Sequence, residues 1–406
     1  MTFSNQDIAQ FMHSSRKLLQ QHDSLHSVSF GFQPDEKLAI FVSFTPPIFL
    51  EKGVPPLIYA DRSNFPTAFQ ELPIIQENRL LGATPNSCEA GGPVDRGDVQ
   101  CELRPGLDIA PVPDEGELHP RRGTLGCIVY DKVTGDAMIL SNWHVMSGST
   151  SLVIQPSTLL MKPPVAGSST AEANGHSQLC AKIMRSSVDY DCAAAVPIHR
   201  TVNTKMLGLG VTPKDAKMPE LNDPVVKFGA GNNRSYGIVK RIGVVRMNFG
   251  GAFADTLLPC CYIARDEAVG QFEDEKQTKE RELVRPGDSG CVWMLREKML
   301  ERKAMVRLLD IITQDPASET MVKEGDSKPS PSQYLKGAVE KQRPASDPEP
   351  RTEPYLRATE TAVGLHFGAD DAVEEFALAI PMPMVLEQLN VSLVWPPPAE
   401  PKPAAN

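Results

Sequence analysis

The stretch LVRPGDSGC, residues 283–291, places a serine in a short segment of glycine, proline and aspartate. Upstream, LSNWHV at residues 140–145 carries a histidine. A nucleophilic serine needs a base to take its proton, a carboxylate to orient that base, and N–H donors for the oxyanion. The chain offers a candidate for each role. Taken alone, Gly-Asp-Ser-Gly could also be a turn in any β protein, in which Asp and Ser bond to the local backbone, so the isolated motif leaves this second interpretation open.

The position of His144 favours a role in chemistry. A lone histidine is more often structural or merely exposed. Here, however, residues 123–131 and 137–142 read as two strands joined by a turn around Thr134 and Gly135. The second strand ends next to His144 and leads the imidazole into a loop at the sheet edge.

The carboxylate candidate is Asp191, which directly precedes the small apolar run CAAAV at residues 192–196. This run reads as a buried strand, and a buried aspartate must have partners. We therefore choose Asp191 over Asp189, which we interpret as a solvated turn acid. A carboxylate that bonds backbone N–H groups at the start of the strand is the other interpretation of Asp191.

The motifs SNWHV (141–145), DCAA (191–194) and GDSG (287–290) follow the order found in trypsin/chymotrypsin-like serine peptidases, which the chain resembles over about residues 120–395. It is most similar to the intracellular branch with plant Narrow-Leaf-type proteins and their bacterial and fungal relatives, in which Gly-Thr-Leu-Gly precedes Leu-Ser-Asn-x-His-Val. The resemblance implies a mainly β fold, a chymotrypsin-like double antiparallel β-barrel. The site would lie between two six-stranded barrels, with a small N-terminal α+β module and a C-terminal helix.

The resemblance also implies a serine endopeptidase that hydrolyses peptide bonds through an acyl-enzyme. A non-catalytic protease-fold scaffold and a self-processing protein that recruits partners are the alternatives. Because the pocket position Leu283 is not acidic, a demand for Lys or Arg in the substrate is disfavoured. The implied residues are the catalytic His144, Asp191 and Ser289, the oxyanion-hole N–H groups of Gly287 and Ser289, and the substrate-pocket residues Leu283, Phe367 and Gly368.

Asp288 has no role in this scheme. In secreted relatives the matching acid pairs with a new amino terminus created by cleavage. Arg121 and Arg122 would be cleavable here, but no convincing activation site precedes Gly123. We therefore expect any activation to be conformational.

Composition limits the partners. The net charge is −10 with basic residues interspersed among acids, which argues against nucleic-acid binding. The first residues lack the features of a signal peptide, and no apolar run is long enough for a membrane span. The eight cysteines read mostly as buried free thiols, and Val145 stands where secreted relatives have a disulfide cysteine. We expect an intracellular, cytoplasmic or nuclear protein with a protein or peptide substrate, no cofactor and no metal. The sequence leaves homo-oligomerisation open.

Four regions follow one another along the chain. Residues 1–85 read as an α+β module with an amphipathic helix and a hairpin. A charged connector rich in glycine and proline covers 86–122, and the peptidase domain covers 123–395. Within that domain, 315–360 has too few apolar residues to offset its ordering entropy and is predicted to be a disordered insertion. A Pro-rich tail covers 396–406.

Overall fold

The computed structural model describes residues 3–33, 35–44, 63, 65–78, 84–85, 100–113, 122–157, 178–249, 255–267, 269, 283–297, 357–370 and 376–396. Contacts divide the chain into one unit of Met1–Arg296 with Ala358–Asn406 and a second of Glu297–Arg357. All elements described below belong to the first unit. Of the insertion predicted at 315–360, only 357–360 are described, and a strand begins there at Ala358; of the tail predicted at 396–406, only Pro396 is described.

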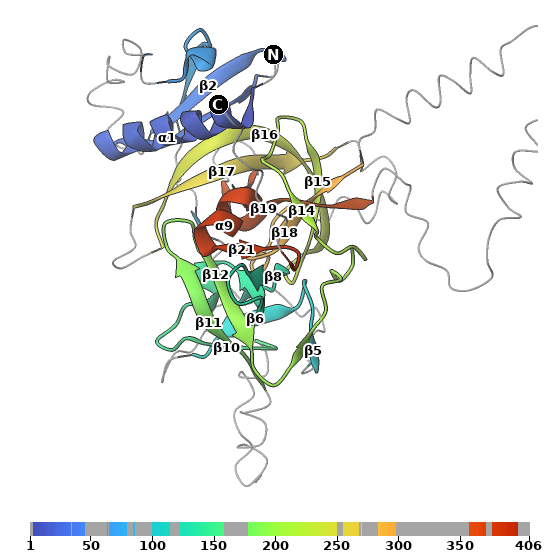
Figure 1. Cartoon of the computed structure of the whole chain (residues 1–406). Helices are drawn as coiled ribbons and strands as arrows, with labels where there is room; N and C mark the ends of the chain where they lie inside the picture. Colours follow the sequence, from blue (N-terminus) through green and yellow to red (C-terminus); the bar gives the residue numbers. More distant parts are fainter. Residues whose placement is uncertain are drawn as a thin grey trace, which may run out of the picture. The chain divides into compact units, whose positions relative to one another are not determined.

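The C-terminal half contains a closed ring of six antiparallel strands (Figure 1). In ring order β15 pairs with β16, then β17, β20, β19 and β18, and β18 returns to β15. These strands are β15 Pro224–Gly229, β16 Asn233–Met247, β17 Thr256–Arg265, β18 Val292–Arg296, β19 Ala358–Asp370 and β20 Phe376–Pro381. The pairing therefore closes a barrel and leaves part of the long β16 free to pair elsewhere.

A second ring lies earlier in the chain. β8 pairs with β9, and the ring continues through β12, β11, β10 and β6 to β7, which precedes β8 by two residues. Counting β7 and β8 as one interrupted strand gives six antiparallel strands. The elements are β6 Asp108–Pro111, β7 Gly123–Thr124, β8 Cys127–Asp131, β9 Ala137–Ser141, β10 Leu152–Ile154, β11 Leu179–Ser187 and β12 Cys192–Pro197. A separate apolar cluster that includes Ile128, Ile139 and Val153 forms its core.

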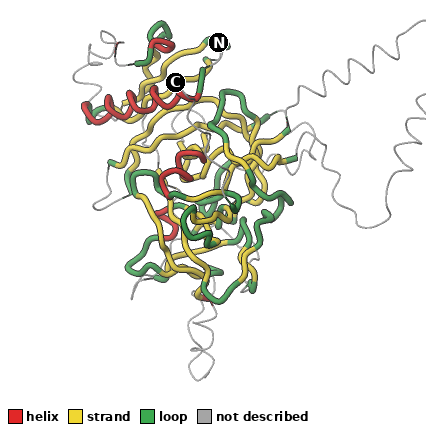
Figure 2. Tube along the Cα trace, viewed as in Figure 1, coloured by secondary structure: helices red, strands yellow, loops and turns green. Residues whose placement is uncertain are grey.

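The fold is thus mainly β and has the expected double antiparallel barrel (Figure 2). The expected C-terminal helix is α9, Met382–Leu389, which directly follows β20 and begins with proline in its first turn. It ends at Asn390, whose left-handed φ of 52° is tolerated well by asparagine. β21, Val391–Ser392, then pairs with β8, so the chain returns to the first barrel.

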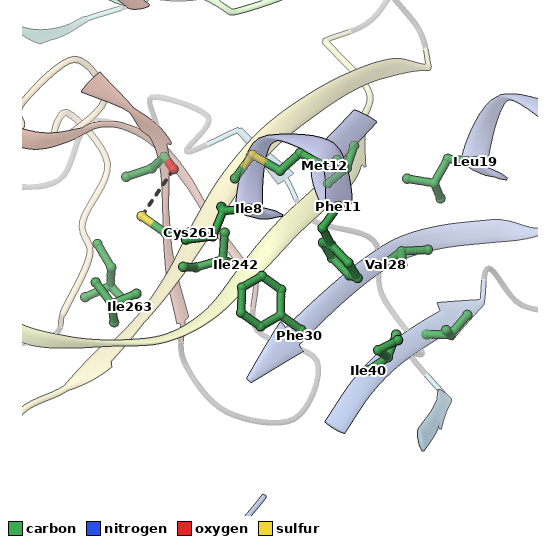
Figure 3. Close-up of a cluster of buried hydrophobic side chains, with 14 of the residues drawn as sticks. Ile8, Phe11, Met12, Leu19, Val28, Phe30, Ile40, Ile242, Cys261 and Ile263 are labelled. Atoms are coloured by element: carbon green, nitrogen blue, oxygen red, sulfur yellow. Dashed lines mark hydrogen bonds between the residues drawn. The ribbon is translucent and has the colours of Figure 1, made fainter. Parts of the chain in front are cut away.

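The predicted N-terminal helix and hairpin are present as α1 Asn5–Gln21, β1 Leu25–Phe32 and β2 Leu38–Phe44. Ser4 caps the helix in a reciprocal arrangement with Asp7. The apolar face of α1 packs on β1, β16 and β17, as Figure 3 shows for Phe11 of α1 and Phe30 of β1, whose rings meet edge to face at 4.9 Å. The periodic apolar positions therefore bury one side of this helix.

The structure differs from the predicted division at residues 1–85 and 86–122. β1 pairs with residues 241–245 of β16, so the N-terminal hairpin extends the sheet of the second barrel. β2 in turn pairs in parallel with β3, Ile74–Asn78. In the connector, β6 is a full member of the first barrel. The proline and glycine that suggested a linker form the turn at Pro105 and Gly106, directly before β6.

The remaining described elements are short. They include two parallel bridges, β5 with β13 and β14 with β19, and one antiparallel bridge, β4 with β19. These elements are β4 Thr84–Pro85, β5 Glu102–Leu103, β13 Thr201–Val202, β14 Asp215–Ala216, the 3-10 helix η2 Thr67–Phe69 and the one-turn helix α4 Trp143–Met146. None of the described helices is long and apolar enough to cross a membrane.

Candidate active site

His144 and Asp191 meet at the ends of two neighbouring strands of the first barrel. β9 and β12 pair with Ser141 opposite Ala193, so the residues after β9 and before β12 lie side by side. His144 follows in α4, and Nδ1 of its ring lies 2.7 Å from Oδ2 of Asp191. The other carboxylate oxygen accepts the backbone N–H of His144 at 2.9 Å. The structure therefore brings together the first two residues of the predicted triad.

The Asp191 carboxylate is fully buried, and its backbone is fixed by Asn142, which donates from Nδ2 to the Asp191 carbonyl at 2.9 Å. Because a carboxylate faces Nδ1 of His144, that nitrogen carries the proton and Nε2 is the acceptor. Nε2 is shielded from solvent and has no hydrogen-bond partner among the described residues. The ring is thus oriented with its basic nitrogen available.

Ser289 lies where the two barrels meet. Its carbonyl accepts the N–H of Thr124 in β7 at 2.7 Å. Gly123 of β7 lies between Ser289 and Val145, the residue after His144. A side chain there would collide with both, because its Cβ would be 2.7 Å from the Ser289 carbonyl oxygen and 2.5 Å from Cγ2 of Val145. Ser289 and the helix that carries His144 are therefore both adjacent to β7. The Ser289 hydroxyl donates to the carbonyl of Phe367 over a long 3.4 Å, and within the described part of the chain it makes no hydrogen bond to His144.

The turn at residues 285–290 contains two buried backbone donors that are candidates for the oxyanion hole. The N–H groups of Asp288 and Gly290 bond to the carbonyls of Arg285 and His366, at 3.0 and 2.8 Å. Among the described residues, no carbonyl accepts from the N–H of Gly287 or Ser289. Gly287 has a φ of 97°, a conformation that L side chains rarely adopt, and its carbonyl is held at 2.7 Å by the Thr124 hydroxyl. Within the described part of the chain, the two predicted oxyanion donors therefore have no partner.

Asp288 is fully buried and forms an ion pair with Lys227 of β15, which is also fully buried. Its carboxylate also accepts three backbone N–H groups, from Arg285 at 3.0 Å, Gly231 at 3.1 Å and Asn232 at 2.9 Å. An internal lysine therefore supplies the positive partner that sequence reasoning could not find. The sequence does contain one indication of this pair. Lys227 stands within the apolar strand VVKF, and a charge that is buried in such a strand must be paired.

Two of the three predicted pocket residues follow a residue that is bonded to the nucleophile turn. Phe367 and Gly368 lie on β19, directly after His366, whose N–H bonds to the Cys291 carbonyl at 2.9 Å. Phe367 is fully buried, and Gly368 lies opposite Leu378 of β20. Leu283 is 2% exposed and belongs to the apolar cluster of the second barrel.

Two aromatic contacts near His144 were not foreseen. Phe249, just beyond β16, stacks on the His144 ring with centroids 5.6 Å apart and planes 24° apart, and it also meets Trp143 edge to face.

His366 is fully buried in edge-to-face contact with Trp293, and burial together with the charge of Lys227 lowers its pKa well below the ordinary 6.5. His366 is therefore neutral at pH 7.

The buried thiols are chemically quiet. Burial raises the pKa of Cys261 to about 12, so it stays protonated. None of the seven cysteines in the described residues forms a disulfide. In the same part of the chain, no group of three or more His, Cys, Asp or Glu side chains is placed to hold a metal ion.

No family model matches the chain, and no curated protein matches it. Solved structures of serine proteases do resemble it. A Nocardiopsis protease (NAPase) is 10% identical over 72% of this chain and 98% of its own, with a TM-score of 0.36. Protease A of Thermobifida fusca is 12% identical with the same two coverages and the same TM-score. A glutamic acid-specific serine protease, described as using a histidine triad in substrate binding, is 12% identical over 72% of this chain and 100% of its own, with a TM-score of 0.38.

Proposed function

We propose that this protein is a serine endopeptidase that cleaves peptide bonds through an acyl-enzyme. The observation that carries the proposal is the contact of 2.7 Å between Nδ1 of the partly buried His144 and the fully buried Asp191, in a fold where Ser289 borders the same strand, β7, as the helix of His144. A structural histidine has no need of a carboxylate on Nδ1 together with an acceptor nitrogen that lacks a partner among the described residues. That combination is what a general base requires.

In the proposed reaction, Oγ of Ser289 attacks the scissile carbonyl carbon and its proton passes to Nε2 of His144. Asp191 stabilises the imidazolium, and the N–H groups of Gly287 and Ser289 bind the oxyanion. The C–N bond then breaks, and His144 donates its proton to the leaving amine. Water attacks the ester in the same way, and the carboxylic acid product and the serine hydroxyl are restored.

The proposed reaction requires the Ser289 hydroxyl to give up its bond to the Phe367 carbonyl, to which it donates at 3.4 Å, and to donate to His144 instead. A bond of this length is weak, and catalytic hydrogen bonds are often loose without substrate. Breaking it is therefore a small cost to the first step.

The proposed substrate is a protein or peptide, with an apolar or small residue favoured by Leu283, Phe367 and Gly368. We also propose an intracellular location, supported by the described cysteines, none of which forms a disulfide, and by Val145 after the catalytic histidine. The ion pair of Lys227 with Asp288 supports a turn that forms without cleavage of the chain.

Labelling with a fluorophosphonate probe tests the proposal. Wild type should react covalently, whereas Ser289→Ala should not react and His144→Ala should react far more slowly. Circular dichroism would establish that each variant is folded. A folded wild type that does not react would contradict the proposal and favour the non-catalytic scaffold, and a change in intact mass on storage that Ser289→Ala abolishes would indicate a self-processing protein.

A further inference from the structure

One edge of β19 leads past the nucleophile. β20 occupies one side of this strand, where Gly368 pairs with Leu378 and Ala369 with Ala377. The other side pairs with β18 as far as Leu365, opposite Val292. The turn that bears Ser289 then takes over, because His366 exchanges two backbone hydrogen bonds with Gly290 and Cys291. This second edge therefore borders the nucleophile turn at residue 366.

β4 lies on the same edge, directly beyond this turn. Thr84 pairs with Ala369 and Pro85 with Gly368 in antiparallel register. Because β20 occupies the opposite edge at these residues, β4 must lie on the edge that borders Ser289. Gly368 is two residues from His366, which corresponds to about 7 Å along a strand. The chain's own segment is thus one or two residues away from the nucleophile turn.

The direction of β4 is also informative. An antiparallel chain that passes Ala369 before Gly368 runs toward Ser289 in its own N-to-C direction. A peptide in the same place would bring its following residues to the serine. Its residues opposite Gly368 and Ala369 would then lie on the acyl side of the bond that Ser289 attacks. β4 therefore has the orientation that such a substrate strand needs.

We propose that Thr84–Pro85 is an intramolecular pseudosubstrate that occupies the peptide-binding edge of the active site on the acyl side. The inference rests on the proposed peptidase function. It adds that a segment of the same chain occupies part of the substrate-binding edge when no substrate is bound. The substrate it competes with is an extended peptide that adds a strand to β19, the mode known as β-augmentation.

The occupant is built to be displaced. Pro85 has no N–H to donate to β19, so β4 forms a poorer ladder than a substrate without proline at this position. Because the segment is part of the same chain, it competes as a tethered ligand, and tethering raises the effective concentration of a weak binder. A weak tethered occupant therefore slows the reaction of Ser289 with peptides that pair with β19, but does not prevent it.

Two covalent probes separate this effect from the chemistry of Ser289. A small alkyl fluorophosphonate reacts with the serine without using the edge, whereas a tetrapeptide diphenyl phosphonate ending in leucine must pair with β19. In the variant Thr84→Gly, which replaces a strand-forming residue and keeps the proline, the rate constant of the tetrapeptide probe should rise, by up to roughly fivefold for an edge that is free about a fifth of the time in wild type. Pro85→Val restores an N–H and a strand-forming side chain, so that constant should fall.

The alkyl probe should react equally with all of these proteins. Thr201→Gly in β13, another two-residue strand, is the matched control and should change neither rate constant. If the tetrapeptide rate constant is the same in wild type, the glycine variant and the valine variant, the inference is wrong.

Hydrogen exchange tests the occupancy without relying on catalysis. In the Ser289→Ala background, the backbone amide of Gly368, which by strand alternation points to the same edge as that of His366, should exchange faster when Thr84 is glycine, whereas that of Ala369, which points to β20, should not change. Unchanged exchange at Gly368 would overturn the inference whether or not the protein is a peptidase. Faster exchange with no labelling of wild type by the alkyl probe would support β4 as the occupant of this edge and contradict the proposed function alone.

Discussion

Replacing Lys227 with methionine tests how the nucleophile turn is held. The substitution keeps most of the side-chain stem and removes the ammonium that pairs with Asp288. Both side chains are fully buried, and removing one partner of such a pair typically destabilises a protein by about 3–5 kcal/mol. Three backbone N–H groups continue to bind the carboxylate, so we expect about 3 kcal/mol.

The substitution can destabilise the nucleophile turn alone rather than the whole fold, because Asp288 precedes Ser289 in that turn. If the turn opens to hydrate the unpaired carboxylate, its formed population falls. A change of about 3 kcal/mol lowers the ratio of formed to open turn roughly 10²-fold, which is the upper limit of the loss in the rate constant for fluorophosphonate labelling. We therefore expect Lys227→Met to react more slowly than wild type, by up to about a hundredfold, with a lower Tm.

Two further variants make the assay specific. Lys217→Met removes a partly exposed lysine that pairs with Asp223 at 3.0 Å, so it should lower Tm less and leave labelling unchanged. In Lys227→Met/Asp288→Asn no unpaired charge remains, and part of the lost stability should return. Wild-type labelling in the folded Lys227→Met protein would refute the reasoning, and a lowered Tm without slower labelling would limit the pair to global stability.

Three further changes have defined outcomes. Asp191→Asn should slow labelling by about 10³–10⁴-fold at pH 7, because the amide reverses the tautomer of His144, and a loss below tenfold would exclude Asp191 as the orienting group. In Gly290→Ala the new Cβ would lie 2.0 Å from Oγ of Ser141 at a φ of 91°, so we expect a fall in Tm and in labelling that adding Ser141→Ala does not fully restore. Because the pKa of His366 is lowered on folding, the unfolded chain takes up a proton below pH 6.5 that the native protein does not, so stability falls as the pH drops by up to about 1.4 kcal/mol per unit. His366→Phe should flatten that slope in thermal unfolding between pH 7.5 and 5, and equal slopes would contradict the pKa direction.

Local patterns predicted the strands around the site. The alternation in residues 123–142 gave the hairpin that became β8 and β9, and the run after Asp191 became β12. These predictions are confirmed because each depends on a turn signal and a period within a single short segment. The amphipathic pattern near the N-terminus predicted α1 for the same reason.

Pairings between distant segments were outside the reach of such patterns. Nothing local in β1 indicates that its partner is β16, more than two hundred residues away, so residues 1–85 read as a separate module. The partner of Asp288 was not predicted for a similar reason, because Lys227 is 61 residues earlier in the chain. A strand of only four residues, such as β6, is difficult to predict, because so short a run has little room for an alternating pattern and resembles a connector.

The shared strand β16 sets a limit on how the chain can be shortened. Its residues 241–245 pair with β17 on one side and with β1 on the other. Deleting the first 44 residues to obtain a minimal double barrel would strip β1 and β2 away and uncover five residues of backbone on that second side. An uncovered edge of this kind recruits strands from other molecules. We therefore expect trimmed versions of the protein to self-associate. By covering this edge, the N-terminal segment would keep the barrel from pairing with other molecules.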